Sequence, residues 1–400
     1  MLPVSRVLPK QILNLTAHER FHQFLILLAA GCLTTMTGGV VSPVLPEMVQ
    51  DLHLDPGWAG TLVSVHALTS AIATPLMGIV ADRVGKLKVM IPCLLLYAFF
   101  GTATAFVTAF PLLLATRGLL GAASGGVAAA VIGLLGSMYE GERRSRVLGY
   151  ATSVMTTSAI FFPLLGGWVG GAHWQYAFYL YALGIPLAAV ALLNLHEPTT
   201  KSDSVLGLGQ GSLGKVVLKQ EILQLYLFIA IAALTVYAVV IYTPLYLKDA
   251  INADPMLNGF VLAVRLVGAA IVSAIGASKL ARRMGKHWAI AFGFSLMALT
   301  LATIPFLTNI FLIVIAAILF GIGFGVITPN LYDTLADRSP AEMRASVLAI
   351  GTGFNSLGQF VSPVLLGPIW KAAGLPTVFY VAGGIALAAA ALSLAQGKRE

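Results

Sequence analysis

Long apolar stretches alternate with short polar ones along the whole chain, and this pattern predicts membrane-spanning helices. A helical span needs about 20 consecutive, mainly apolar residues. Twelve stretches of the 400-residue sequence meet that requirement, at 22–45, 57–81, 88–108, 111–137, 145–170, 174–195, 222–247, 257–279, 287–307, 309–334, 343–372 and 375–395. Short segments of alternating apolar and polar residues, which a membrane β-barrel requires, do not occur in the sequence. The pattern therefore predicts an all-α integral membrane protein with twelve transmembrane helices.

Composition agrees with a chain that lies in a lipid bilayer. The sequence is 58% hydrophobic and only 10% charged, and its mean hydropathy is +0.89. A soluble protein carries roughly a quarter charged residues. These few charges cannot cover a water-facing surface, so the lipid bilayer is the expected surrounding of the chain.

Basic residues fall almost entirely on one side of the predicted membrane. With a cytoplasmic N-terminus, that side collects Arg6, Lys10, Arg20, Arg83, Lys86, Lys88, Arg143, Arg144, Arg146, Lys201, Lys215, Lys219, Lys279, Arg282, Arg283, Lys286, Arg338, Arg344, Lys398 and Arg399. The opposite side receives only Lys248 and Lys371. By the positive-inside rule, this asymmetry predicts a multi-pass protein of the cell (inner or plasma) membrane with both termini in the cytoplasm. It also explains the net charge of +8, so no nucleic-acid partner is expected.

The second half of the chain repeats features of the first half at an offset of 200 residues. The matched positions include Arg83 and Arg283, Gly85 and Gly285, Lys86 and Lys286, Gly121 and Gly321, Gly125 and Gly325, Glu142 and Glu342, Arg144 and Arg344, and Pro163 and Pro363. Six spans are an even number, so both halves enter the membrane in the same orientation. We therefore predict two parallel six-helix pseudo-repeats, 1–195 and 221–400, joined by a cytoplasmic linker at 196–220. Transporters of this layout place the substrate between their halves near the middle of the membrane.

The predicted linker contains a sequence that resembles a nucleotide-binding loop. "GQGSLGKV" (209–216) fits G-x-G-x-x-G, but a phosphate-binding loop follows a strand and has Ser or Thr after its lysine, where this chain has Val216. A flexible linker is the better interpretation, and without an ATP site any uphill transport has to use an ion gradient. The two cysteines, Cys32 and Cys93, fall inside predicted spans, so no disulfide framework is expected.

A short charged loop follows the second predicted span. "GIVADRVGK" contains Gly78, Asp82, Arg83, Gly85 and Lys86, and it resembles the loop between helices 2 and 3 of the major facilitator superfamily. The resemblance covers the whole chain, although Leu87 departs from the pattern at its last basic position. It implies that this loop is a conformational latch, in which the Asp82 carboxylate faces the start of helix 11 near Glu342 in one state of the transport cycle. The alternative is a basic loop that only sets topology.

Two further stretches resemble the drug:proton antiporter branch of that superfamily. Arg117 and Gly121 in helix 4 match R-x-x-x-G, which implies a role for Arg117 in proton movement; a structural clamp bonded to backbone carbonyls is the alternative. In helix 5 the antiporter signature is matched at Gly149, Pro163, Gly166 and Gly167. Its two middle glycines are replaced by Ser158 and Phe162, and a Pro-kinked packing helix is the alternative interpretation.

Polar and aromatic residues inside the predicted spans are candidates for a substrate cavity. The single candidates are Arg265, Tyr150, Tyr237 and Tyr242. A polar patch is formed by Asn330, Asp333, Asn355 and Gln359, and for this patch ordinary interhelical hydrogen bonding is the default interpretation. Since no Asp or Glu lies in the middle of a span, the candidates for proton coupling are Glu47, Asp333 and His66.

The function that follows is secondary active transport by alternating access, with proton-coupled export of small amphiphilic compounds or drugs as the leading hypothesis. A carrier for a specific anionic metabolite, working as a uniporter or exchanger, is the alternative. No H-E-x-x-H or G-x-S-x-G motif occurs and the seven His are scattered, so a membrane enzyme is not expected. The predicted protein is a monomer that uses the proton gradient and has no cofactor and no metal.

Overall fold

The computed structural model describes residues 17–139, 141–196 and 210–397, and they form helices and short connections with no strand. Before residue 197 the elements are α2 (Ala17–Gly39), η1 (Ser42–Val44), α3 (Leu45–Asp51), α4 (Pro56–Ala59), α5 (Thr61–Val84), α6 (Lys86–Ala103), η2 (Thr104–Phe106), α7 (Phe110–Met138), α8 (Gly141–Ser158), α9 (Phe161–Gly170), α10 (Trp174–Tyr179), η3 (Leu180–Leu183) and α11 (Gly184–Asn194). After residue 209 they are α12 (Gln210–Val217), α13 (Gln220–Ile251), α14 (Pro255–Ile275), α15 (Ala277–Met284), α16 (Lys286–Thr303), η5 (Ile304–Phe306), α17 (Ile310–Asp337) and α18 (Arg344–Gly397).

Eleven helical stretches among the described residues are long and apolar enough to cross a membrane. The last of them, Arg344–Gln396, has 53 residues, and a straight helix of that length would measure about 80 Å, far beyond the roughly 30 Å hydrocarbon core. Its path turns at Gly374, where φ is 81° and the helix is interrupted. Division at Gly374 gives the twelve spans that the sequence predicts, with ends close to the predicted ones.

Helices pack mainly against others of the same half of the chain. In the first half α7 lies against α2, α5 and α6, and in the second half α13, α16 and α18 pack together while α14 and α16 lie against α17. The buried core is apolar and continuous through both halves. The chain thus forms two helical groups, one on each side of residues 197–209.

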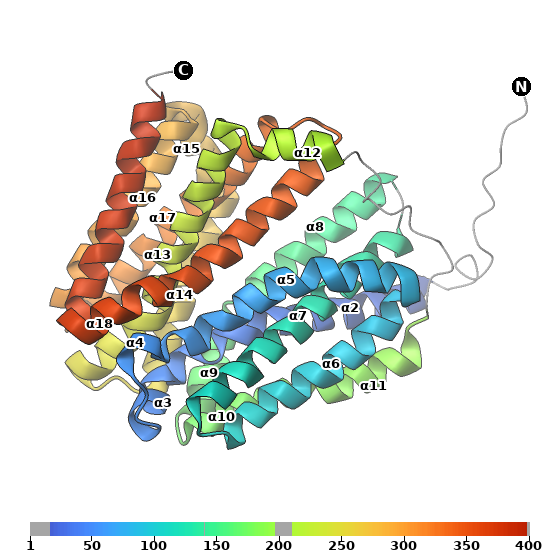
Figure 1. The fold of residues 1–400 in the computed structure, drawn as a ribbon, viewed down its shortest axis with the longest axis horizontal. Coiled ribbons are helices and arrows are strands. Elements are labelled where there is room, and N and C mark those ends of the chain that lie inside the picture. Colours follow the sequence, from blue (N-terminus) through green and yellow to red (C-terminus); the bar gives the residue numbers. More distant parts are fainter. Residues whose placement is uncertain (1–16, 140, 197–209, 398–400) are drawn as a thin grey trace, which may run out of the picture.

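Among the described residues, the main contacts between the two groups lie at one end (Figure 1). Contacts between them involve η1, α3, α4, α5 and α9 on one side and α13, α14 and α18 on the other. From there the groups diverge toward the end where α8 and α12 lie (Figure 1). We refer to the touching end as the closed end and to the diverging end as the open end.

The predicted linker at 196–220 is only partly described. Residues 197–209 lie outside the described part, whereas Gln210–Val217 form the helix α12 instead of a flexible segment. The physical reason is that α12 has an apolar side: Val216 is buried in the core and Leu213 and Val217 pack against it. The phosphate-loop resemblance also fails here, because Gly211 and Gly214 lie within this helix.

Candidate functional site

Arg117 occupies the interior of the first helical group, where it is 1% exposed. From α7 its Nε donates to the carbonyl oxygen of Leu62 (3.0 Å), Nη2 to that of Thr37 (2.5 Å), and Nη1 to the hydroxyl of Tyr181 (3.1 Å). The Tyr181 hydroxyl in turn donates to the same Thr37 carbonyl at 2.9 Å. The guanidinium therefore ties together α2, α5, α7 and η3, which is the geometry of the structural-clamp alternative.

Arg265 is the second buried guanidinium, in the middle of α14 and 4% exposed. Its Nε and Nη1 are fully buried without a hydrogen-bond partner, and in the described part of the chain the side chain forms no ion pair. The hydroxyl of Thr243 on α13 is likewise buried and unpartnered, and both side chains line the same small cavity. A buried cation without a partner is costly, so this is the least satisfied polar group inside the second helical group.

His66 of the first group and Tyr237 of the second group both lie beside Gly38. A Cβ atom placed on Gly38 would lie 2.9 Å from Cε1 of His66 on α5 and 3.3 Å from the hydroxyl of Tyr237 on α13. Gly38 is thus the small residue that lets these two side chains approach from opposite groups. The predicted cavity positions His66 and Tyr237 therefore lie at the junction of the groups.

The other two predicted aromatic residues have different surroundings. Tyr242 is 0% exposed and makes an edge contact with Trp370, with ring centroids 5.9 Å apart. Tyr150 on α8 is 62% exposed and lies on a helix whose contacts are with the first group. Tyr150 and Tyr237 therefore share no cavity in this arrangement of the groups.

Backbone-to-backbone packing of α9 against α14 closes one side of the closed end. A Cβ atom on Gly167 would overlap the carbonyl oxygen of Pro255, and one on Gly259 would overlap that of Pro163. Gly166 packs on Val40 in the same close manner, with 2.5 Å from its notional Cβ to the Val40 oxygen. Two of the four predicted helix 5 residues, Pro163 and Gly167, thus serve this contact, whereas Gly166 packs within the first group and Gly149 has open space around it.

The equivalent packing on the other side of the closed end joins α18 to α4 and α5. A Cβ atom on Gly367 would overlap the carbonyl oxygen of Gly57, and one on Gly60 would lie 2.9 Å from the Pro363 Cβ atom. Small residues allow the two groups to seal at this end without a side-chain layer between them.

Two ion pairs cross between the groups at the closed end. Lys248 Nζ lies 3.2 Å from Oε1 of Glu47, with both side chains 20% exposed, and Lys371 Nζ lies 2.6 Å from Oδ2 of Asp55. The hydrogen bond from Lys371 lowers the pKa of Asp55 below its ordinary value, with help from the Gly57 backbone N–H. Sequence reasoning named Glu47 but missed Asp55, although Lys248 and Lys371 stood out as the two exceptions to the charge asymmetry.

The predicted latch loop lies at the open end. Gly85 takes φ 121° and so makes the turn between α5 and α6, and Lys86 is buried while Asp82 and Arg83 are exposed. Asp82 makes no hydrogen bond or ion pair with any described residue, and Gly78 has no close neighbour. The contact of Asp82 with helix 11 is absent from this arrangement, and its occurrence in another state stays a prediction.

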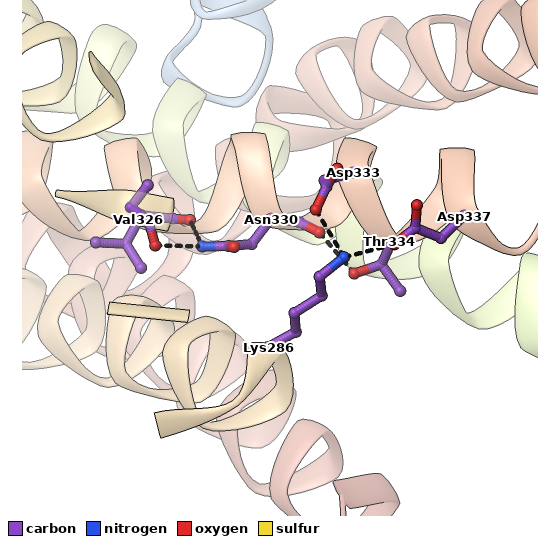
Figure 2. Close-up of polar contacts among 7 residues, drawn as sticks. Lys286, Val326, Asn330, Asp333, Thr334 and Asp337 are labelled. Carbon is purple, nitrogen blue, oxygen red and sulfur yellow. Dashed lines mark hydrogen bonds and ion pairs between the residues drawn. The ribbon is translucent and has the colours of Figure 1, made fainter. Parts of the chain in front are cut away.

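Figure 2 shows the corresponding polar cluster of the second group, also at the open end. Lys286 at the start of α16 bonds Asp333 Oδ2 at 2.6 Å and Asp337 Oδ2 at 2.7 Å, both on α17. Asn330, one turn before Asp333, donates to the Val326 carbonyl oxygen at 2.8 Å. The Asp333 side chain is 62% exposed and already paired, so it lies away from the junction of the groups.

The four-residue polar patch expected from the sequence stays a prediction as one unit, because its two pairs make separate hydrogen bonds. Gln359 donates to Asn355 on the same helix, α18, at 2.6 Å, whereas Asn330 and Asp333 belong to the Lys286 cluster. The sequence placed all four near one level of the membrane, but it carried no information on which faces of α17 and α18 point toward each other.

Comparison with known proteins decides the family. The family model of the Major Facilitator Superfamily matches residues 27–264 and 225–399. The chain belongs to the major facilitator superfamily. Its membership agrees with the resemblance seen in the latch loop and in helices 4 and 5, and it makes the chain a multi-pass membrane transporter.

Relatives in this superfamily include two named for resistance and export. The quinolone resistance protein NorA of Staphylococcus aureus (strain MSSA476) is 24% identical over 367 residues, covering 89% of this chain and 92% of the relative. The bacillibactin exporter of Bacillus subtilis (strain 168) is 22% identical over 350 residues, covering 84% and 86%.

Solved structures with the same fold span different named transporters. A bacterial homologue of the human lysosomal transporter Spinster, inward-facing and occupied, has a TM-score of 0.83 at 16% identity and covers 96% of this chain and 98% of that one. The nucleoside transporter NupG has a TM-score of 0.78 at 16% identity, covering 94% of this chain and 99% of that one. At these identities the likeness concerns the superfamily fold alone.

Proposed function

We propose that this superfamily member exports small amphiphilic compounds in exchange for protons, by alternating access between two six-helix halves. The observation that carries the proposal is the asymmetry of the contacts between the halves: they seal at one end through glycines and ion pairs and diverge at the other. Rigid-body rocking of such halves around a central site is how secondary transporters alternate their access.

The direction in which the protein opens follows from charge. The latch loop and the Lys286 cluster lie at the open end, which carries most of the described basic residues. By the positive-inside rule this end and both termini face the cytoplasm of a bacterial plasma membrane, so the arrangement is open to the inside. A monomer suffices for this mechanism, because both halves of the pathway come from one chain.

The tandem repeat is supported by matched contacts at the closed end. Gly167 packs on Pro255 at the start of α14, and Gly367, its partner at an offset of 200, packs on Gly57 at the start of α4. Each of those starts is an Asp-Pro pair, with Asp254 and Asp55 as the capping residues. Two parallel halves related by a pseudo-two-fold axis along the membrane normal account for this correspondence.

Glu47 is the best of the three candidates for the proton-coupling group. It belongs to the first half, is largely buried, and pairs with Lys248 of the second half. When the closed end opens, Glu47 parts from Lys248 and can take up a proton from outside. When the pair re-forms as this end seals, the proton is expelled toward the open, cytoplasmic end, which is the exchange an antiporter needs. Asp333 is exposed at the other end, and His66 has the lower rank because it is enclosed at the junction.

Export is supported by the names of the two relatives, a resistance protein and an exporter. The second candidate function is a carrier for a defined anionic metabolite, and the observation that favours it is the unpartnered guanidinium of Arg265.

The test is transport by purified protein in liposomes with an imposed pH gradient, using lipophilic cations, aromatic acids and nucleosides as the panel. The proposal predicts that substrate movement consumes the gradient, and that Asp82→Asn and Glu47→Gln slow it strongly. Movement of a compound at the same rate with and without the gradient would exclude proton exchange.

A further inference from the structure

A small cavity lies beside Arg265 inside the second half and has no assigned role. It is lined by Arg265 and Thr243 together with apolar side chains that include Val239, Leu262 and Phe320. Its volume is about 20 Å³, which is room for about one solvent-sized group. No Asp or Glu is among the residues that line it.

The cavity presents donors and a positive charge without any acceptor to match them. Nε and Nη1 of Arg265 and the Thr243 hydroxyl are all buried and unpartnered. A water molecule could accept two hydrogen bonds, but it would leave the charge uncompensated in apolar surroundings, where that charge is most costly. The missing partner is therefore an anionic group with acceptor oxygens, which form charge-assisted hydrogen bonds with a guanidinium.

The backbone around Arg265 holds this side chain in place. Gly321 of α17 packs so closely that a Cβ atom there would overlap the Arg265 carbonyl oxygen. The guanidinium is therefore carried on a fixed stretch of α14, so it cannot reach a distant protein carboxylate by a shift of that helix. Tyr237 lies on α13, the helix that also carries Val239 and Thr243 of the cavity wall, and like His66 it lies beside Gly38 at the junction of the halves.

We propose that Arg265 and Thr243 form the subsite for the carboxylate of the transported compound. One oxygen of the carboxylate occupies the small cavity and accepts hydrogen bonds from the guanidinium and the hydroxyl. The apolar body of the compound extends toward Tyr237 at the junction. This inference rests on the proposed function and narrows it, because it makes the substrate class amphiphilic monocarboxylic acids.

The experiment is equilibrium binding to the purified full chain in detergent at neutral pH, with 2-naphthoate and its uncharged amide, 2-naphthamide, as paired probes. The variants are Arg265→Gln, Arg265→Lys and Thr243→Val. Lys219→Gln is the matched control, because it removes an equal charge from an exposed position outside the cavity. Sodium methanesulfonate replaces chloride in a parallel series, so that inorganic anions are tested separately.

We expect naphthoate to bind more tightly than naphthamide. The ratio of their two dissociation constants should fall at least about tenfold in Arg265→Gln, because loss of one charge-assisted hydrogen bond changes an affinity by that factor. Arg265→Lys keeps part of the preference, Thr243→Val loses less of it, and Lys219→Gln keeps all of it. An unchanged preference in Arg265→Gln and Thr243→Val overturns the inference. The inference is also overturned if naphthoate displaces bound chloride but its affinity does not depend on Arg265, since the cavity would then hold an inorganic ion.

Failure of the broader proposal would look different. Binding is measured without a membrane or gradient, so Arg265-dependent binding of naphthoate together with pH-independent transport would refute proton-coupled export and leave the carboxylate subsite intact.

Discussion

Arg117 and Arg265 both lie within membrane-spanning helices, and both are almost completely buried. Each of the three guanidinium nitrogens of Arg117 donates to an oxygen of its own half, namely two backbone carbonyls and the Tyr181 hydroxyl. Arg265 has the same charge and a similar depth, yet no described residue accepts from it. The comparison shows that burial of a charged side chain does not identify its role. Whether its hydrogen-bond donors find acceptors in the protein does identify it.

The two sites also differ in what their neighbours could supply. Arg117 lies where α2, α5 and η3 converge, so carbonyl oxygens of other helices are within reach. Arg265 faces a cavity whose walls are apolar apart from Thr243. We interpret the first site as a fixed part of the scaffold and the second as an incomplete site that a ligand completes.

Removal of the Arg117 guanidinium should have the largest effect on stability. Arg117→Gln leaves the Leu62 and Thr37 carbonyls without their donor, and we expect a loss of about 3 kcal/mol or more in the free energy of unfolding. Thermal unfolding can be followed by maleimide labelling of Cys93, which is buried in the native state. Tyr181→Phe removes one hydroxyl from the same network and should cost only about 1 kcal/mol. A stable Arg117→Gln protein with an altered pH dependence of transport would instead assign Arg117 to proton movement.

The same change at Arg265 should have the opposite sign. Arg265→Met replaces an unpaired buried charge by an apolar side chain of similar length, and we expect stabilisation by about 1 kcal/mol or more in the ligand-free protein. The same maleimide assay measures it, and 2-naphthoate should stabilise the wild type but not this variant. Equal destabilisation by Arg117→Gln and Arg265→Met would remove the distinction between the two sites.

A built-in partner for Arg265 should make the two sites alike. Thr243→Asp places a carboxylate on the wall of the cavity that Arg265 lines. We expect a gain in stability of about 1 kcal/mol, with loss of naphthoate binding because the site is already filled. Thr243→Asn, similar in size but uncharged, is the control and should leave stability unchanged. Naphthoate binding that survives in Thr243→Asp would show that the carboxylate is bound elsewhere.

The sequence predicted the fold well, because the signals involved are local or repetitive. Each membrane span is a run of apolar residues, and the repeat lies at a constant offset, so the number of spans and their approximate ends follow directly. The exception was α12, where three apolar side chains make a helix of what composition suggested was a flexible linker.

The candidate site was harder to predict, since it depends on which helix faces meet. Arg117 and Arg265 were both recognised as buried cations, but only the folded structure separates one with acceptors around it from one without them. The expected polar patch divided into two clusters for the same reason. The seal at the closed end was visible in part, because Lys248 and Lys371 broke the charge asymmetry, but their partners Glu47 and Asp55 lie in the other half of the chain, far away in sequence.

The smallest effect should come from the Asp55–Lys371 pair, which provides a baseline for a charge pair that water can reach. Lys371 lowers the pKa of Asp55 below its usual 3.8. The ion pair therefore contributes its full stabilisation of the closed end at a pH above 3.8. This stabilisation is lost as the pH falls through the lowered pKa of Asp55. Asp55→Asn should therefore unfold at a slightly lower temperature than the wild type at neutral pH, with the difference disappearing in strong acid. The exposed pair is screened by salt, so the difference should also shrink at high ionic strength, whereas the effects at Arg117 and Arg265 should not. If salt reduced the stability changes at Asp55, Arg117 and Arg265 alike, both buried arginines would be in contact with water. The difference between Arg117 and Arg265 would then not come from the presence or absence of protein acceptors.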